Sequence, residues 1–168
     1  LAVFPHFVFD RSKPGMLCID QTGKRFVNES RSYHEFGKVM LEGGASTNPA
    51  WIIGDADTIQ KYGLGMVRLG GDDLRPYLAD GYLLEGKTLD ELAQKLQVSA
   101  DNLKASIAQM NEAAQSGVDT VFNRGSTVYQ RANGDATHQP NPTLGAIKTA
   151  PFYAVKLYPA DIGTARGL

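Results

Sequence analysis

The chain has 168 residues, enough for one hydrophobic core, and its 42% apolar and 21% charged residues are typical of a globular domain. The formal net charge of −1 gives no electrostatic reason to expect nucleic acid or an anionic membrane as a partner. No apolar run approaches the ~18 residues of a membrane-spanning helix, and we expect a cytoplasmic protein. Cys18 is the single cysteine, which excludes an internal disulfide, and its apolar neighbours predict a buried, unreactive thiol.

Short strands are predicted near the start of the chain. Phe7-Val8-Phe9 and Met16 to Ile19 are apolar runs separated by the turn signal Pro14-Gly15. Arg25 to Asn28 resumes as a third strand, so the simplest expectation for residues 5–29 is a β-meander.

Helical spacing begins after Ser32 and ends at Gly43-Gly44, with the apolar face formed by Tyr33, Phe36, Val39 and Met40. Ala50 to Ile53 is predicted to be a strand, and a short helix is expected after Asp57. Residues 64–86 are rich in glycine, and their pattern assigns no element.

Two further helices are the clearest local signals in the sequence. Thr88 and Glu91 form a capping box before an apolar stripe that ends at Leu96. Ser99 is placed to cap a second helix to about Gln115, with Gly117 past its end, and we interpret both helices as scaffold.

The last part of the chain is predicted to be a long loop followed by a strand. Residues 117–149 are loop-rich, and Pro140-Asn141-Pro142 excludes a helix at these three positions. Phe152 to Leu157 alternates as a strand does. The elements together indicate one α+β domain over residues 1–168, with a small mixed or antiparallel sheet and several packed helices.

No metal site is expected, because His6, His34 and His138 show no ligand spacing and Cys18 lies in a predicted strand. The sequence has no nucleophile elbow, phosphate loop or dinucleotide fingerprint.

Tyr33 is the most informative candidate residue, because it lies between a predicted strand end at Asn28-Glu29-Ser30 and a predicted helix start. A phenol at that junction either faces a cleft or packs on the helix with its hydroxyl at the surface. Glu29 and Arg31 form either an exposed ion pair or a polar edge for a ligand.

Two loop segments carry the remaining candidates. Phe122, Arg124 and Tyr129 either belong to a surface turn or anchor a loop over a cleft. After the last strand, Gly163 would let the backbone approach a planar ligand closely, and the same segment is equally consistent with an ordinary loop.

Two stretches resemble one flavoenzyme superfamily. KRFVNES followed by SYHEFG, and the run from FNRG through PNPTLG and PFYAV to PADIGTARGL, are similar to the patterns of 3-ketosteroid dehydrogenases. These enzymes belong with the fumarate reductases. The resemblance implies that residues 1–168 are the inserted substrate-capping domain of a larger enzyme. FAD would then be held mainly by a nucleotide-binding domain of the same parent polypeptide.

The resemblance also implies roles for individual residues. Tyr33 takes the position of the catalytic tyrosine, whereas fumarate reductases carry an arginine proton donor there. The expected substrate is a steroid-like ketone. Phe36, Phe122, Arg124 and Tyr129 would bind it, and the cofactor would be contacted by Asn28, Glu29, Ser30, Asp161, Gly163 and Thr164. The sequence departs from the pattern at Arg166, where the family usually has glycine.

Two alternatives remain open at this level. A fumarate-reductase-like enzyme acting on another unsaturated acid would need Arg31, Arg124 or Arg166 to bind the carboxylate. A free-standing binding module would need no catalytic residue.

Overall fold

The structure, a computed structural model, describes Phe4 and residues 9–70 and 73–160. Its strands are β1 (Leu17–Ile19), β2 (Ala50–Asp55), β3 (Leu83–Gly86) and β4 (Phe152–Leu157). Its helices are α1 (Tyr33–Glu42), α2 (Ala56–Tyr62), α3 (Arg75–Ala79), α4 (Leu89–Leu96), α5 (Ala100–Ser116) and α6 (Val128–Ala132), with a 3₁₀ turn over Gly44–Ser46. This confirms the α+β class.

The sheet is antiparallel throughout, with the strand order β1-β2-β4-β3. The central strands β2 and β4 are separated by almost a hundred residues, and Ile52 lies opposite Val155. The last strand of the chain therefore completes the middle of the sheet, and the fold cannot form without its C-terminal third.

The predicted β-meander is wrong for the residues that are described. β1 pairs with β2, and Arg25 forms no more than an isolated bridge with Ile19. The amide of Arg25 donates instead to the Ser106 hydroxyl of α5, at 3.0 Å. Since a helix side chain satisfies this backbone donor, the segment after residue 24 needs no strand partner. Residues 7 and 8 of the predicted first strand lie outside the described residues, and Phe9 lies in a turn.

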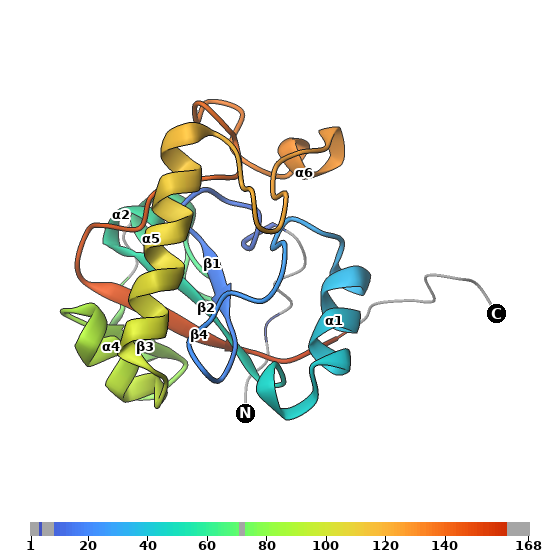
Figure 1. Cartoon of the computed structure of the whole chain (residues 1–168). Coiled ribbons are helices and arrows are strands. Elements are labelled where there is room, and N and C mark those ends of the chain that lie inside the picture. Colours follow the sequence, from blue (N-terminus) through green and yellow to red (C-terminus); the bar gives the residue numbers. More distant parts are fainter. Residues whose placement is uncertain (1–3, 5–8, 71–72, 161–168) are drawn as a thin grey trace.

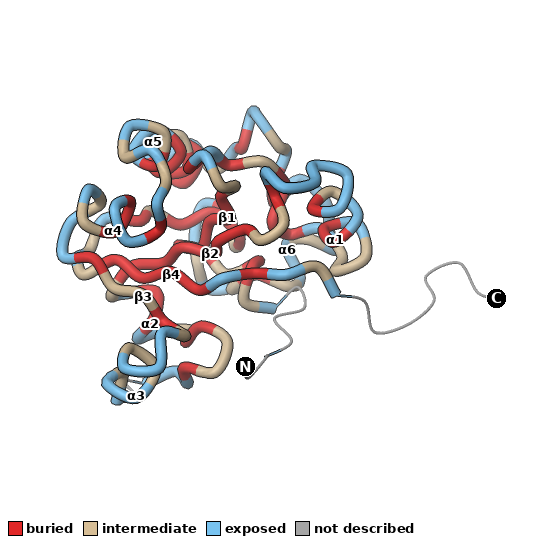
Figure 2. Tube along the Cα trace, turned by 90° about the horizontal axis from the view of Figure 1, so that it is seen from below, coloured by how far each residue is buried: buried red, intermediate tan, exposed pale blue. Residues whose placement is uncertain are grey.

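Helices cover both faces of the sheet, and α5 crosses one face (Figure 1). On that face Leu17, Trp51 and Ala154 pack against α4 and α5. On the other face Cys18, Ile52 and Val155 pack with α1 and α2. Because both of its faces are covered, β2 is buried along its whole length, as Figure 2 shows for the centre of the sheet.

The predicted capping signals are confirmed. Thr88 and Ser99 each accept an amide hydrogen bond in the first turn of their helices, and Ser32, which was not predicted as a cap, does the same for α1. Glu91 reaches back to the amide of Lys87, and Gly117 ends α5 in the left-handed region, at φ 77°. Residues 64–86, which had no sequence assignment, contain α3 and β3.

Candidate functional site

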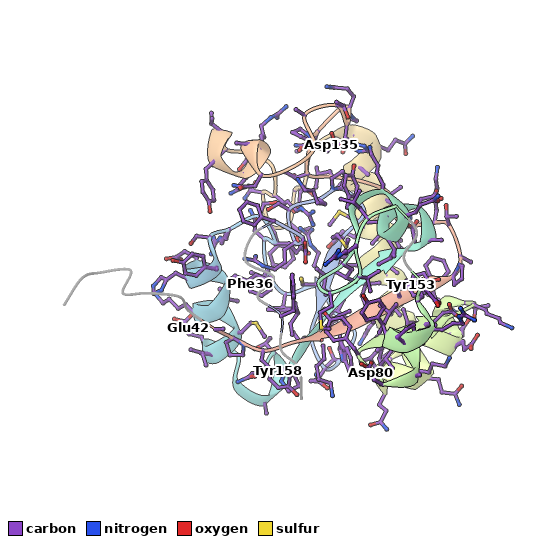
Figure 3. The ribbon with its side chains drawn as sticks, turned by 180° about the vertical axis from the view of Figure 1, so that it is seen from behind. Phe36, Glu42, Asp80, Asp135, Tyr153 and Tyr158 are labelled. Atoms are coloured by element: carbon purple, nitrogen blue, oxygen red, sulfur yellow. The ribbon has the colours of Figure 1, made fainter. Side chains whose placement is uncertain are left out.

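A cleft of about 1020 Å³ opens where β4 continues beyond the end of its pairing with β3. Its lining is strongly aromatic and comes from separate parts of the chain: Phe4, Tyr33, Phe36, Trp51, Tyr82 and Tyr158. Figure 3 labels Phe36, Tyr158 and Asp80 of this lining, which come from α1, the segment after β4 and the loop before β3. Such walls suit a flat, largely apolar ring system with a few polar groups.

Tyr33 and Phe36 are the two predicted site residues that line this cleft. Tyr33 is the first residue of α1 and is half-buried, and Phe36 follows one helical turn later and is buried. The side chain of Ser32 caps the helix by accepting from the amide of Glu35, at 3.3 Å. This cap fixes the residue at which α1 begins, so the phenol projects from a defined position.

The segment before α1 is a tight turn, in which the amide of Arg31 donates to the carbonyl oxygen of Asn28, at 3.2 Å. We call residues 28–31 the 28–31 turn. The side-chain oxygen of Asn28 accepts from the amide of Ser30, and its side-chain nitrogen donates to the carbonyl oxygen of Phe122. Asn28 and Ser30, both predicted to contact a cofactor, are buried. Here Asn28 stabilises the turn and ties it to the loop that carries Phe122.

Glu29 is fully buried at the centre of an ion network. Its carboxylate accepts from Arg25 Nε at 2.8 Å and Nη2 at 2.7 Å, and it pairs with Arg124 Nη1 at 3.2 Å. It also accepts from the amide of Cys18. Arg25 Nη2 continues to Asp119 at 2.6 Å. Burial alone would raise the pKa of Glu29, but Arg25 and Arg124 outweigh it and hold the pKa below its ordinary value of 4.5.

Arg124 is held inside the protein and does not line the cleft. Its side chain is 0% exposed, and besides Glu29 it donates to the carbonyl oxygens of Met16 and Lys13. The sequence predicted that Glu29 and Arg124 contact ligands, but both belong to this interior network. The structure shows them joining β1, the 28–31 turn and the loop after α5.

Phe122 and Tyr129 also lie outside the lining of the cleft. The half-buried ring of Phe122 has the Arg25 guanidinium 4.8 Å from its centroid, and Tyr129 is 51% exposed on α6. The substrate-binding roles of these residues and of Arg124 remain predictions. Asp161, Gly163 and Thr164, together with Arg166, lie outside the described residues.

Sequence reasoning missed several residues of the cleft, chief among them Arg11. This side chain is 2% exposed, donates to the carbonyl oxygen of Glu29 at 2.6 Å and lies 4.0 Å from the centroid of the Phe36 ring. The sequence signal for Arg11 was weak: a cation two residues before Lys13, in the turn that precedes an apolar strand. Tyr158 was also missed, although a tyrosine directly after the last strand and before Pro159 is suited to a cleft edge.

Within the part of the chain that the structure describes, no three His, Cys, Asp or Glu side chains gather as metal ligands. None of the described helices is long and apolar enough to cross a membrane.

The sequence profile of the FAD binding domain family matches residues 4–168. The chain belongs to this family. It is 39% identical over 168 residues to a 4-oxocyclohex-2-ene-1-carboxylate 5-dehydrogenase of Sinomonas cyclohexanicum, covering 99% of this chain and 28% of that protein. It is also 39% identical to a 3-oxosteroid 1-dehydrogenase of Mycolicibacterium smegmatis, over 95% of this chain and 29% of that protein.

A solved structure shows the same fold. The 3-ketosteroid Δ1-dehydrogenase of Sterolibacterium denitrificans, in complex with 1,4-androstadiene-3,17-dione, superimposes with a TM-score of 0.89 at 35% identity. The match covers 94% of this chain and 29% of that one. The chain thus spans less than a third of the length of these relatives.

FAD is the cofactor of this family, and the described residues fit one part of it. The aromatic walls around Tyr33, Phe36 and Tyr158 suit a flat ring. A pyrophosphate is usually held by a glycine-rich turn before a helix, and the sequence has no such fingerprint. The aromatic cleft therefore suits contact with a ring.

Proposed function

We propose that this chain is the substrate-capping domain of an FAD-dependent dehydrogenase that desaturates a ring ketone next to its carbonyl group. The observation that carries the proposal is the placement of Tyr33 on the aromatic cleft, at the capped start of α1. The relatives named above support this reaction class, because both the steroid and the oxocyclohexene carboxylate enzymes are dehydrogenases whose names specify ring ketones. We assign residues 1–168 to that domain and propose that the enzyme is cytoplasmic.

In this proposal Tyr33 removes the acidic proton from the carbon next to the carbonyl group. The neighbouring carbon loses a hydride, so two hydrogens leave and one carbon–carbon double bond forms. Bound FAD supplies the acceptor for that hydride. A general base must lie within hydrogen-bond reach of the proton that it removes, and Tyr33 lines the cleft that would hold the substrate.

In this proposal the other residues of the cleft bind the substrate and orient it. Phe36 and Tyr158 present ring faces and edges to a flat substrate, and the hydroxyl of Tyr158 adds a second phenol to the same cleft. A carbonyl oxygen that becomes an enolate needs a donor of this kind. The carboxylate of Glu29 is already occupied, so we assign Glu29 an indirect role, through the 28–31 turn that contains Asn28 and Ser30.

The remaining cofactor contacts are proposed for Asp161, Gly163 and Thr164, in the segment directly after Tyr158. The nucleotide part of FAD would be bound by another domain of the same polypeptide, which would close the cleft over the substrate. Closure of this kind excludes water from the reacting atoms.

The test uses the complete flavoprotein that contains this chain. Wild-type enzyme is expected to oxidise 4-androstene-3,17-dione or 4-oxocyclohexanecarboxylate and, in reduced form, to leave fumarate unchanged. Tyr33→Phe should lower kcat by about 10²- to 10⁴-fold, the usual contribution of a general base. It should also abolish exchange of the substrate α-proton in D₂O.

Tyr62→Phe is the matched control, because Tyr62 lies on α2, outside the cleft lining, and donates to Asp135. That variant should keep both turnover and exchange. If Tyr33→Phe exchanges the α-proton at the wild-type rate, Tyr33 is not the base and the proposal fails.

A further inference from the structure

Arg11 contacts both the 28–31 turn and the helix that carries Tyr33. Its Nη1 donates to the carbonyl oxygen of Glu29 at 2.6 Å and to that of Arg31 at 3.4 Å. The guanidinium carbon also lies 4.0 Å from the centroid of the Phe36 ring, one helical turn after Tyr33. One planar group thus touches the chain before α1 begins and again in its first turn.

These contacts use the particular shape of arginine. Its guanidinium reaches two carbonyl oxygens while its flat face stacks on an aromatic ring, and a lysine ammonium, which is not planar, cannot stack in this way. The contacts are shielded from water, because Arg11 is 2% exposed, and the residue belongs to the wall of the cleft. Hydrogen bonds and ring contacts made away from water are stronger than those at a surface.

Arg11 differs from the nearby arginines in the atom of Glu29 to which it donates. The carboxylate of Glu29 is bound by Arg25 and Arg124, whereas Arg11 binds the backbone oxygen of the same residue. Burial lowers the pKa of Arg11 from 12.5 to about 10, so the guanidinium stays protonated at neutral pH. The network holds the interior side of the turn, and Arg11 holds its cleft side.

We propose that Arg11 is a positioning residue: it fixes the 28–31 turn and the first turn of α1 so that the phenol of Tyr33 meets the substrate. This inference rests on the proposed role of Tyr33. It assigns to Arg11 a function in the dehydrogenation that acts through the position of Tyr33.

The experiment compares Arg11→Met and Arg11→Lys in the complete flavoprotein, with 4-androstene-3,17-dione and 4-oxocyclohexanecarboxylate as probes. Misplacing a catalytic group by about 1 Å costs on the order of 100-fold in rate. We therefore expect kcat to fall by about 100-fold in Arg11→Met, with a smaller loss in Arg11→Lys and little change of KM. Arg75→Met is the matched control, because Arg75 is exposed and paired with Asp73.

Amide hydrogen exchange supplies a readout that does not depend on turnover. Arg11→Met should speed exchange in peptides that cover residues 28–37 and leave those of α5 unchanged. If Arg11→Met does not fold, Arg11→Lys carries both measurements, since it keeps the charge and removes the planar stacking on Phe36.

The outcomes separate this inference from the proposed function. Unchanged exchange over residues 28–37 would overturn the positioning role, and so would faster exchange with an unchanged kcat. A higher KM at constant kcat would also overturn it, by showing that Arg11 binds substrate directly. If wild-type enzyme oxidises neither ketone while exchange still changes in Arg11→Met, Arg11 holds the turn as inferred and the proposed function is at fault.

Discussion

Replacing Glu29 by glutamine should lower the free energy of unfolding far more than the small change in side-chain shape suggests. In the buried network two carboxylates, Glu29 and Asp119, balance the guanidinium groups of Arg25 and Arg124. Glutamine keeps one acceptor oxygen for Arg25 Nε and the amide of Cys18. Its other terminal atom becomes an NH₂ group that faces the donors Arg25 Nη2 and Arg124 Nη1, so donors oppose donors and one positive charge is left unbalanced.

The size of the effect follows from the burial of the partners. The side chains of Arg25, Glu29 and Arg124 are at most 1% exposed, so water cannot replace the lost carboxylate. Removing one partner from a buried ion pair costs about 3–5 kcal/mol. A typical domain is stable by about 5–15 kcal/mol, so this one change would remove a large share of the total.

Urea unfolding of the purified chain, followed by circular dichroism, measures the effect. With a slope of about 2 kcal/mol per molar urea, Glu29→Gln should lower the midpoint by about 1.5–2.5 M. Glu42→Gln is the control, because Glu42 is 65% exposed and lies 3.8 Å from Lys38. It should change stability by less than about 0.5 kcal/mol.

The pH dependence gives an independent check with a defined sign. The pKa of Glu29 is lower in the folded state than its ordinary 4.5, so this group stabilises the fold above about pH 4.5. Its contribution is lost as the pH falls below that value, and Glu29→Gln should flatten the acid limb of the stability curve. The account of the network would be refuted if Glu29→Gln lowered the free energy of unfolding by less than about 1 kcal/mol at pH 7 and left the acid limb of the stability curve unchanged.

Two further predictions concern other parts of the fold. Cys18 is fully buried, and burial raises the pKa of its thiol. Native protein at pH 8 should therefore not react with a thiol reagent such as DTNB. Rapid reaction without denaturant would show that β1 opens. Thr88→Ala removes the cap of α4 and should cost about 1 kcal/mol, lowering Tm by about 2–4 °C in calorimetry. Thr120→Ala, at an exposed turn position, should leave Tm nearly unchanged.

The sequence by itself determined the helices α1, α4 and α5 and indicated the chemical class. Ser32, Thr88, Ser99 and Gly117 act within one turn of chain, so their spacing is sufficient to place the ends of α1, α4 and α5. The motifs around Tyr33 and before Pro159 likewise indicated the flavoprotein family that the comparisons show.

Only the tertiary structure decided how the strands pair and which polar groups are available to a ligand. β1 pairs with β2 rather than with a neighbouring hairpin strand, because a strand edge is satisfied by whichever partner packing brings to it. Glu29 and Arg124 are 95 positions apart, and no local pattern indicates that they neutralise each other inside the protein. Arg11 became visible as a cleft residue only when folding placed it over Phe36. The physical reason is the same in each case: burial and charge pairing depend on long-range contacts, which sequence spacing does not encode.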